Sequence, residues 1–302
     1  MPLDQEDFKI CFHIGYHKTA SSWLQFNVFP KCPDICFLNP PGDKYREHFR
    51  QQVLFDDDFS FDLEGAGSDF YAEIDKKRKN NQKVILLSEE DLSGHMYNGY
   101  NSRRHADRLK SLAPAAKIVI VIRRQQDYVR SAYSFYVKRG GALSPGRWMK
   151  DIEIPASQII GKLNYHKLIE YYFSIFGKEN VLVLPYELIK VDKGKSFLDR
   201  VHQFLDLGPF AEDIYRKIDS RRVNPGLSSG LSHSLARLTN GVFGGVLPVN
   251  AWALSKADQL VLRHIEKWEG DLLGKSVDRF IESNRRTAEL IGADLRQFGY
   301  PL

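Results

Sequence analysis

Four short apolar runs, each rich in strand-forming residues and bounded by polar ones, most constrain the fold of this chain. They cover residues 8–14 (FKICFHI), 84–87, 118–122 and 181–184. The segments between them have helical patterns; in residues 157–176, for example, Leu163, Leu168, Tyr172 and Ile175 fall near helical spacing before Gly177. Buried strands that alternate with helices predict an α/β fold with a mainly parallel central sheet flanked by helices.

The last third of the chain has no further strand pattern. Helical patterns cover residues 193–206, 230–240, 255–271 and 274–291, so we expect a helical C-terminal third that packs on the sheet. A chain of 302 residues forms one large domain or two small ones. Because no linker or repeat divides it, we expect one domain over 1–302 with helical and loop insertions.

Composition excludes several classes of protein. The 43 Lys and Arg against 38 Asp and Glu give a net charge of +5, too mild and too evenly spread for a nucleic-acid-binding protein. No apolar run approaches the ~20 residues that a membrane helix needs, and no leader pattern opens the chain, so we expect a cytoplasmic protein without an integral membrane segment. The three cysteines have no second pair of metal ligands near them, and we interpret them as reduced thiols.

The stretch from His13 to Ser22, HIGYHKTASS, places small and hydroxyl residues where the first strand leads into a helix over about residues 21–29. Backbone N–H groups at a helix start, the helix dipole and the charge of Lys18 all favour an anion there. Hydroxyl groups of Thr19, Ser21 and Ser22 add further donors. We therefore predict an anion-binding loop.

This loop does not have the order of a kinase phosphate loop, G-x-x-x-x-G-K-[ST], because Lys18 precedes the small residues. It resembles the 5′-phosphosulfate loop of the bacterial sulfotransferases that use 3′-phosphoadenosine 5′-phosphosulfate (PAPS), H-I-G-x-H-K-T-G-T-[ST]-[ST]. The departure from that pattern is Ala20, where the family has glycine. A methyl group there restricts the backbone and crowds a phosphate, although a helical N-terminus tolerates alanine. The positions that match the family are His13, Ile14, Gly15, His17, Lys18 and Thr19, followed by the hydroxyl pair Ser21 and Ser22.

The third apolar run leads into RRQQDYVRS, in which Arg123 and Ser131 are eight residues apart. In sulfotransferases an arginine and a serine with this spacing hold the 3′-phosphate of the donor, and the resemblance assigns that role to this pair. An arginine at a strand end and a hydroxyl two turns into the next helix can converge on one phosphate. Arg124 and Arg130 are rival candidates for the same contact.

Acidic residues follow the second apolar run, at the edge where open α/β sheets bind ligands. Related sulfotransferases have S-x-E here, which corresponds to Ser88 and Glu90. The acceptor must lose a proton as it attacks sulfur, and Glu90 is our first candidate for the general base. The alternatives are that Glu89, Glu90 and Asp91 only cap the next helix, or that His17 or His95 is the base.

Further landmarks extend the resemblance over nearly the whole chain. Residues 164–187 resemble the family's helix and strand ending Y-E, and 221–229 (RRVNPGLSS) resemble its N-x-S-L-S loop, which nominates Arg222 and Asn224 as donor contacts. The resemblance implies the P-loop-like sulfotransferase fold and sulfuryl transfer from PAPS to a hydroxyl or amine, without a metal. The implied catalytic residues are Lys18, which stabilises the leaving phosphate, Glu90 and His17; the implied donor contacts are Gly15, Lys18, Thr19, Ala20, Ser21, Ser22, Arg123, Ser131, Arg222 and Asn224.

By analogy with bacterial relatives we expect the acceptor to be a carbohydrate or glycolipid. Residues 31–80, 94–102 and 139–157 are the segments that could line its cleft, with Phe55, Phe59, Phe61 and Trp148 suited to stacking on sugar rings. Two other functions remain open. One is a nucleotide-dependent kinase on a similar sheet, and the other is a non-catalytic protein that binds anionic glycans.

Overall fold

A parallel sheet organises the molecule. The computed structural model describes residues 8–138, 147–148, 159–218 and 274–302. In this part of the chain five strands form one sheet in the order β2-β3-β1-β4-β5, and each strand is parallel to its neighbours. Their bounds are β1 Lys9–His13, β2 Ile35–Phe37, β3 Val84–Ser88, β4 Lys117–Ile122 and β5 Val181–Pro185. The α/β fold with a mainly parallel, helix-flanked sheet is thereby confirmed.

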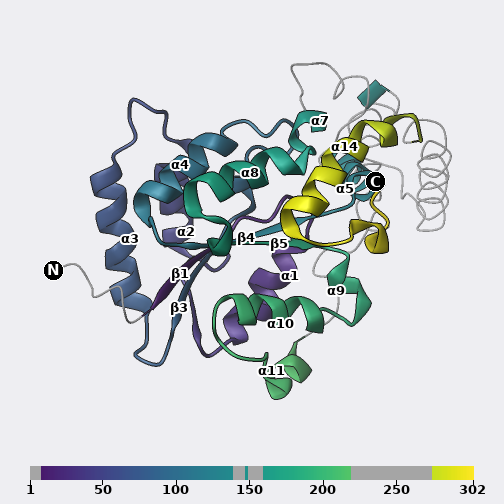
Figure 1. The fold of residues 1–302 in the computed structure, drawn as a ribbon. Helices are drawn as coiled ribbons and strands as arrows, with labels where there is room; N and C mark the ends of the chain where they lie inside the picture. Colours follow the sequence, from purple (N-terminus) through teal and green to yellow (C-terminus); the bar gives the residue numbers. More distant parts are fainter. Residues whose placement is uncertain (1–7, 139–146, 149–158, 219–273) are drawn as a thin grey trace, which may run out of the picture.

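Helices cover both faces of the sheet, and Figure 1 shows α4 and α8 on one side with α10 and α11 on the other. The first face is covered by α2 Lys44–Phe49, α3 Leu63–Lys77, α4 Ser102–Leu112, α5 Gln125–Lys138, α8 Tyr165–Phe176 and α14 Gly274–Ile291. The second is covered by α1 Ser21–Trp23, the π-helical turn η1 Leu24–Val28, the 3₁₀ turn η2 Phe29–Lys31, α9 Leu188–Val191, α10 Lys195–Phe204 and α11 Glu212–Lys217. Shorter elements are η3 Arg50–Phe55, η4 Glu90–Ser93, α7 Ile159–Lys162, η5 Lys178–Asn180 and η8 Leu295–Phe298.

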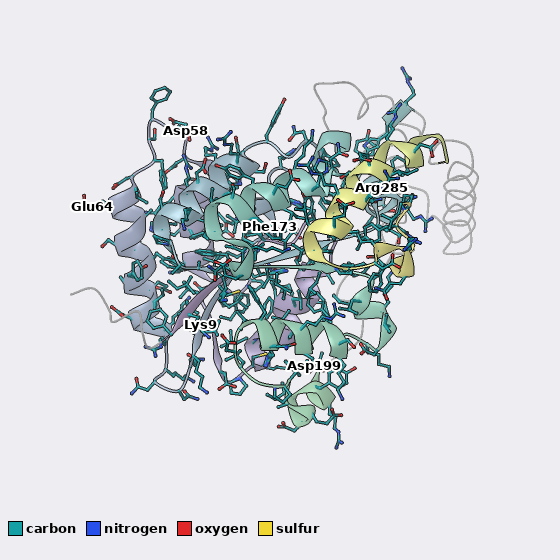
Figure 2. All side chains as sticks on the ribbon, viewed as in Figure 1. Lys9, Asp58, Glu64, Phe173, Asp199 and Arg285 are labelled. Carbon is teal, nitrogen blue, oxygen red and sulfur yellow. The ribbon has the colours of Figure 1, made fainter. Side chains whose placement is uncertain are left out.

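The strands are apolar on both faces because each face is covered. Along β4, Val119 and Val121 pack against α10 and its neighbours, while Ile118 and Ile120 pack into the larger core under α4 and α8. Side chains fill the space between the sheet and both helical layers (Figure 2). Continuous rather than alternating apolar runs are what a sheet buried on both faces requires.

The connections that leave the central strands diverge. The chain runs from β1 to α1 on one face, whereas it runs from β3 to α4 and from β4 to α5 on the other. Since β1 lies between β3 and β4, its carboxyl end is the point at which the connections diverge to opposite faces. That is the position where open α/β sheets bind ligands.

Several sequence-based expectations are corrected. The helix expected over residues 157–176 is two helices, α7 and α8, separated by Leu163 and Asn164. The helix expected from about Ser21 to Phe29 is a short α1 that passes into a π-helical turn. Strand β2 has no counterpart in the sequence analysis, because three residues beside a Pro-Cys segment are too short for a periodic signal.

Other expectations are met or lie outside the described residues. Helices α10 and α14 lie at the predicted positions, and residues 203–218 and 274–302 contain no strand. The predicted helices at 230–240 and 255–271 lie outside the residues that the structure describes, and the single domain over 1–302 stays a prediction. No helix in the described ranges is long and apolar enough to cross a membrane. Cys11, Cys32 and Cys36 are buried free thiols.

Candidate functional site

The loop after β1 stays attached to the sheet before it turns. The N–H groups of Ile14 and Tyr16 donate to Val119 and Val121 of β4 at 2.9 Å each. The backbone then turns through left-handed conformations at Lys18 (φ 66°) and Ala20 (φ 68°) before α1 begins at Ser21. The loop and the start of α1 are therefore positioned at the carboxyl end of β1.

Close packing explains the glycine and the threonine of this loop. A Cβ atom on Gly15 would lie 2.9 Å from Nε2 of His13 and 3.0 Å from Oγ1 of Thr19, so only glycine fits without displacement. Thr19 is buried and its hydroxyl donates to the carbonyl of Tyr16. Thr19 thus shapes the loop through its side chain, and its backbone N–H is the group it can offer to a ligand.

Ala20 differs from the interpretation made from sequence. It is the N-cap residue of α1 and has left-handed backbone angles (φ 68°, ψ 20°), so it does not lie within the helical N-terminus that tolerates alanine. A residue with a Cβ atom is strained in this region by about 1–2 kcal/mol, whereas glycine is not. The departure from the family pattern therefore falls at a position where the backbone favours glycine.

Two buried donors at the loop lack a partner in the described part of the molecule. Oγ of Ser21 is buried and accepts or donates no hydrogen bond there, and the same holds for Nε of Arg123. Unpaired buried polar atoms cost stability unless a ligand satisfies them. Both residues belong to the set nominated for donor binding, and both fit an anionic group.

Arg123 reaches the loop from the end of β4. Its guanidinium donates to the carbonyl of Lys18 at 2.7 Å and lies 4.7 Å from the ring centre of Tyr186. Arg124 instead pairs with Asp127 at 2.9 Å, and Arg130 lies 3.9 Å from the same carboxylate. The geometry directs Arg123, rather than its two rivals, toward the loop.

The remaining candidates on this side are less constrained. Ser131 is partly buried, two turns into α5. Arg222 and Asn224 lie outside the residues that the structure describes. Their assignments as donor contacts stay predictions.

The polar residues after β3 divide into structural and exposed groups. Ser88 is buried, and its Oγ lies 2.7 Å from Nδ1 of His13, whose pKa burial lowers to about 4. Glu89 is buried between Arg46 at 2.9 Å and Arg50 at 2.7 Å. It also caps η4 through a bond from the N–H of Asp91, so the capping alternative applies to Glu89.

Glu90 is different from its neighbours. It is partly exposed at the first position of η4, and no hydrogen bond or ion pair within the described ranges engages its carboxylate. A carboxylate that is not consumed by structural contacts remains able to accept a proton. Among the described acids after β3, Glu90 is thus the one whose carboxylate structural contacts leave available, and its role as general base stays a prediction.

His17 is held by both ring nitrogens. Nε2 lies 2.8 Å from Asp91 and Nδ1 lies 3.4 Å from Nζ of Lys162. Burial lowers the pKa of His17, and the charge of Lys162 lowers it further against the opposing hydrogen bond to Asp91. The neutral ring donates from Nε2 to Asp91 and accepts at Nδ1, an arrangement that positions the loop and leaves no ring nitrogen for an acceptor.

Asp91 anchors this arrangement. Burial acts to raise its pKa, but the bond from His17 and the 2.8 Å ion pair with Arg50 outweigh burial and hold the pKa well below its ordinary value. His95, the other histidine considered, is exposed and contacts Asn98 at 3.0 Å.

Lys162 is the site residue that sequence reasoning missed. Its ammonium is buried and donates to the carbonyls of Gly94 at 2.8 Å and His95 at 3.0 Å, beside the contact with His17. Burial lowers the pKa of Lys162 to about 7, although Asp91 and Glu90 oppose the shift. It stands 71 positions after Asp91 in a stretch with no motif, so no local signal marked it.

A cleft of about 380 Å³ opens beside this arrangement, between the segment 93–103 and helices α7 and α8. Tyr16 and Lys162 connect its wall to the loop. Part of the segment 94–102 lines it, and the role of that segment in binding an acceptor stays a prediction. The four aromatic residues proposed for sugar stacking do not; Phe55 and Phe59 are exposed, and Trp148 is buried against Tyr97 and Tyr133.

No protein-family model matches this chain, and no curated protein matches it in sequence. Solved structures that resemble it include a sulfotransferase from Alicyclobacillus acidocaldarius, with 19% identity and a TM-score of 0.49 over 78% of this chain and 96% of that one. The sulfotransferase domain of the Synechococcus PCC 7002 olefin synthase has 15% identity and a TM-score of 0.45, over 87% and 95%. A mouse sulfotransferase in complex with PAP has 14% identity and a TM-score of 0.37, over 92% and 89%.

Proposed function

We propose that this protein is a sulfotransferase that moves a sulfuryl group from PAPS to a hydroxyl or amine of a carbohydrate or glycolipid. The observation that carries the proposal is the junction of the β1 loop with the end of β4. Arg123 bonds to the Lys18 carbonyl, and buried donors on Ser21 and Arg123 have no partner in the part of the chain that the structure describes. A donor with phosphate groups at both its 5′ and 3′ positions would satisfy both elements at once.

The chemistry needs three functions from the protein. As the acceptor oxygen attacks sulfur, the bond between sulfur and the bridging oxygen breaks, and the electron pair remains on the departing 5′-phosphate. Lys18 and the N–H groups at the start of α1 would stabilise that charge. Glu90 would take the proton released by the acceptor. In this proposal His17 holds the loop, and in-line positioning supplies much of the rate.

Calorimetric titration tests the donor directly. We expect 3′,5′-adenosine bisphosphate, the desulfonated product, to bind without a metal and more tightly than ADP or ATP. Preference for ATP with Mg²⁺ would contradict the proposal and favour the kinase. If the protein binds the bisphosphate but transfers no sulfuryl group to any glycan, the result would favour the non-catalytic glycan-binding protein.

A further inference from the structure

The cleft beside the loop has an uneven charge. Arg103 of α4, Lys162 of α7 and Lys167 of α8 line it, and none of its described lining residues is a carboxylate. The chain as a whole has nearly balanced charges, 43 basic against 38 acidic. The presence of three basic residues from three separate helices, with no acidic residue in the described lining, is therefore a local property of this cleft.

The three cations differ in how firmly they are held. The donors of Lys162 are occupied by Gly94, His95 and His17, so its side chain is held in the wall, and a pKa lowered by burial to about 7 leaves it partly charged at neutral pH. Its role in the cleft is to add part of the positive potential rather than a direct contact.

Arg103 and Lys167 are both exposed, so they can reach a ligand. Arg103 lies 4.9 Å from the ring centre of Tyr171, whose hydroxyl donates to Asp107. Asp107 is an acidic residue that interacts electrostatically with this guanidinium, and it is not among the residues that line the cleft. Lys167 forms no ion pair within the described ranges. These two residues are the exposed charges that line the cleft.

The rest of the lining is polar and aromatic. Ser93, Asn98, Ser102 and Asn164 offer hydroxyl and amide groups, and Tyr16 and Tyr171 offer rings. Hydrogen-bonding groups beside aromatic faces suit a sugar, which presents hydroxyls at its edge and C–H groups on its face.

We propose, on the basis of the function proposed above, that the acceptor is an acidic carbohydrate whose carboxylate or sulfate ester binds beside Arg103 and Lys167. The cleft wall at Tyr16 and Lys162 then directs a hydroxyl of that sugar toward the loop that contains Lys18. Acidic sugars bind here because their charge meets basic side chains in a described lining that contains no carboxylate, and neutral sugars of equal size bind weakly.

The test uses the full chain saturated with 3′,5′-adenosine bisphosphate and three hexasaccharides: a neutral glucan, a hyaluronan fragment with carboxylates only, and a sulfated form of the glucan with sulfate esters only. We expect at least one acidic probe to bind more tightly than the glucan, and its affinity to fall as salt rises. Arg103→Gln and Lys167→Gln should each weaken acidic binding by about threefold to fivefold, as removal of one partly exposed charge pair does. Lys110→Gln, on α4 but outside the cleft, is the matched control.

Affinity for the bisphosphate in the same variants separates the two proposals. Unchanged bisphosphate binding with weakened acidic-glycan binding supports the inference, and preference for either acidic probe identifies which group is recognised. Equal affinity for neutral and acidic probes, or full acidic binding by both cleft variants, would overturn it while donor binding persists. Loss of donor binding in the wild-type protein would instead refute the function proposed above.

Discussion

The junctions after β1 and β4 lie side by side in the sheet but are built differently. The β1 junction has seven residues between the strand and α1, and its backbone is left-handed at Lys18 and Ala20. The β4 junction needs only Arg123 and Arg124 before α5 begins, and its residues have no positive φ. The first is thus suited to bind through its backbone, and the second through its side chains.

The support of the two junctions differs as well. The β1 loop is held from outside, by Arg123 at the Lys18 carbonyl and by Asp91 and Lys162 at His17. The β4 junction is held by its own helix, in which Asp127 pairs with Arg124, and also by Tyr165 at the Arg123 carbonyl and Glu187 at the Arg124 N–H. Both junctions therefore depend on distant residues, but only the β1 loop also has left-handed backbone, a strain that persists only where surrounding contacts hold it.

The largest effect should come from removing the charge of the β1 loop. Lys18→Ala should lower turnover by the equivalent of about 2–4 kcal/mol, as loss of one oxyanion donor does, with a smaller change in donor affinity. Rates of sulfuryl transfer at saturating PAPS measure it. Lys31→Ala, which removes an exposed lysine at the end of the 3₁₀ turn η2, is the control. A turnover equal to that of the wild type would remove Lys18 from the chemistry.

The second largest effect should distinguish the roles of Arg123 and Arg124 in donor binding. Arg123→Ala should weaken binding of 3′,5′-adenosine bisphosphate by about 1.5–3 kcal/mol, the range for a hydrogen bond to a charged group. It also releases the Lys18 carbonyl, so turnover should fall too. Calorimetry on Arg124→Ala provides the comparison, because that residue is paired with Asp127. Equal losses in both variants would mean that the two arginines share the phosphate.

A pH effect tests the external support of the β1 loop. An unfolded lysine stays protonated to about pH 10.4, whereas burial lowers the pKa of Lys162 in the folded protein to about 7. Between these values the unfolded state binds more protons, so stability should rise with pH, by at most about 1.4 kcal/mol per unit. The cost of burying the charge is complete below pH 7 and disappears above the unfolded value.

Lys162→Met removes this titration and is therefore the matched variant. Urea unfolding of both proteins from pH 6 to 9 should show the wild type gaining stability relative to the variant as pH rises. Parallel curves would mean that Lys162 titrates alike in the folded and unfolded states.

The smallest effect concerns the strain in the β1 loop. Ala20→Gly should raise the free energy of unfolding, or donor affinity, by about 0.5–1 kcal/mol, because the relief of the Cβ strain at φ 68° is partly offset by the greater backbone entropy of glycine in the unfolded chain. Thermal unfolding with and without the bisphosphate measures both. Ala72→Gly in the interior of α3 should do the opposite, since glycine weakens a helix interior. A loss of stability in Ala20→Gly would show that the left-handed backbone at this residue is not strained.

Sequence patterns predicted the frame of the fold well. The four apolar runs became β1, β3, β4 and β5 because a strand buried on both faces must be continuously apolar, which is a local property. The break between α7 and α8 and the short β2 were missed, since both depend on how the segments pack. The sequence motif identified Gly15 as a matching position but did not explain it. The structure does, because a side chain at this position would crowd Thr19.

By itself the sequence determined the class of fold, the loop at the end of β1 and the arginine at the end of β4, because each follows from residues close together in the chain. Only the tertiary structure decided that Arg123 faces the loop and that Lys162 lies against His17. It also decided that Glu89 forms ion pairs with Arg46 and Arg50, whereas Glu90 does not. These contacts join residues 39 to 145 positions apart. Electrostatic energy depends on distance in space and on burial, and neither can be read from spacing along the chain.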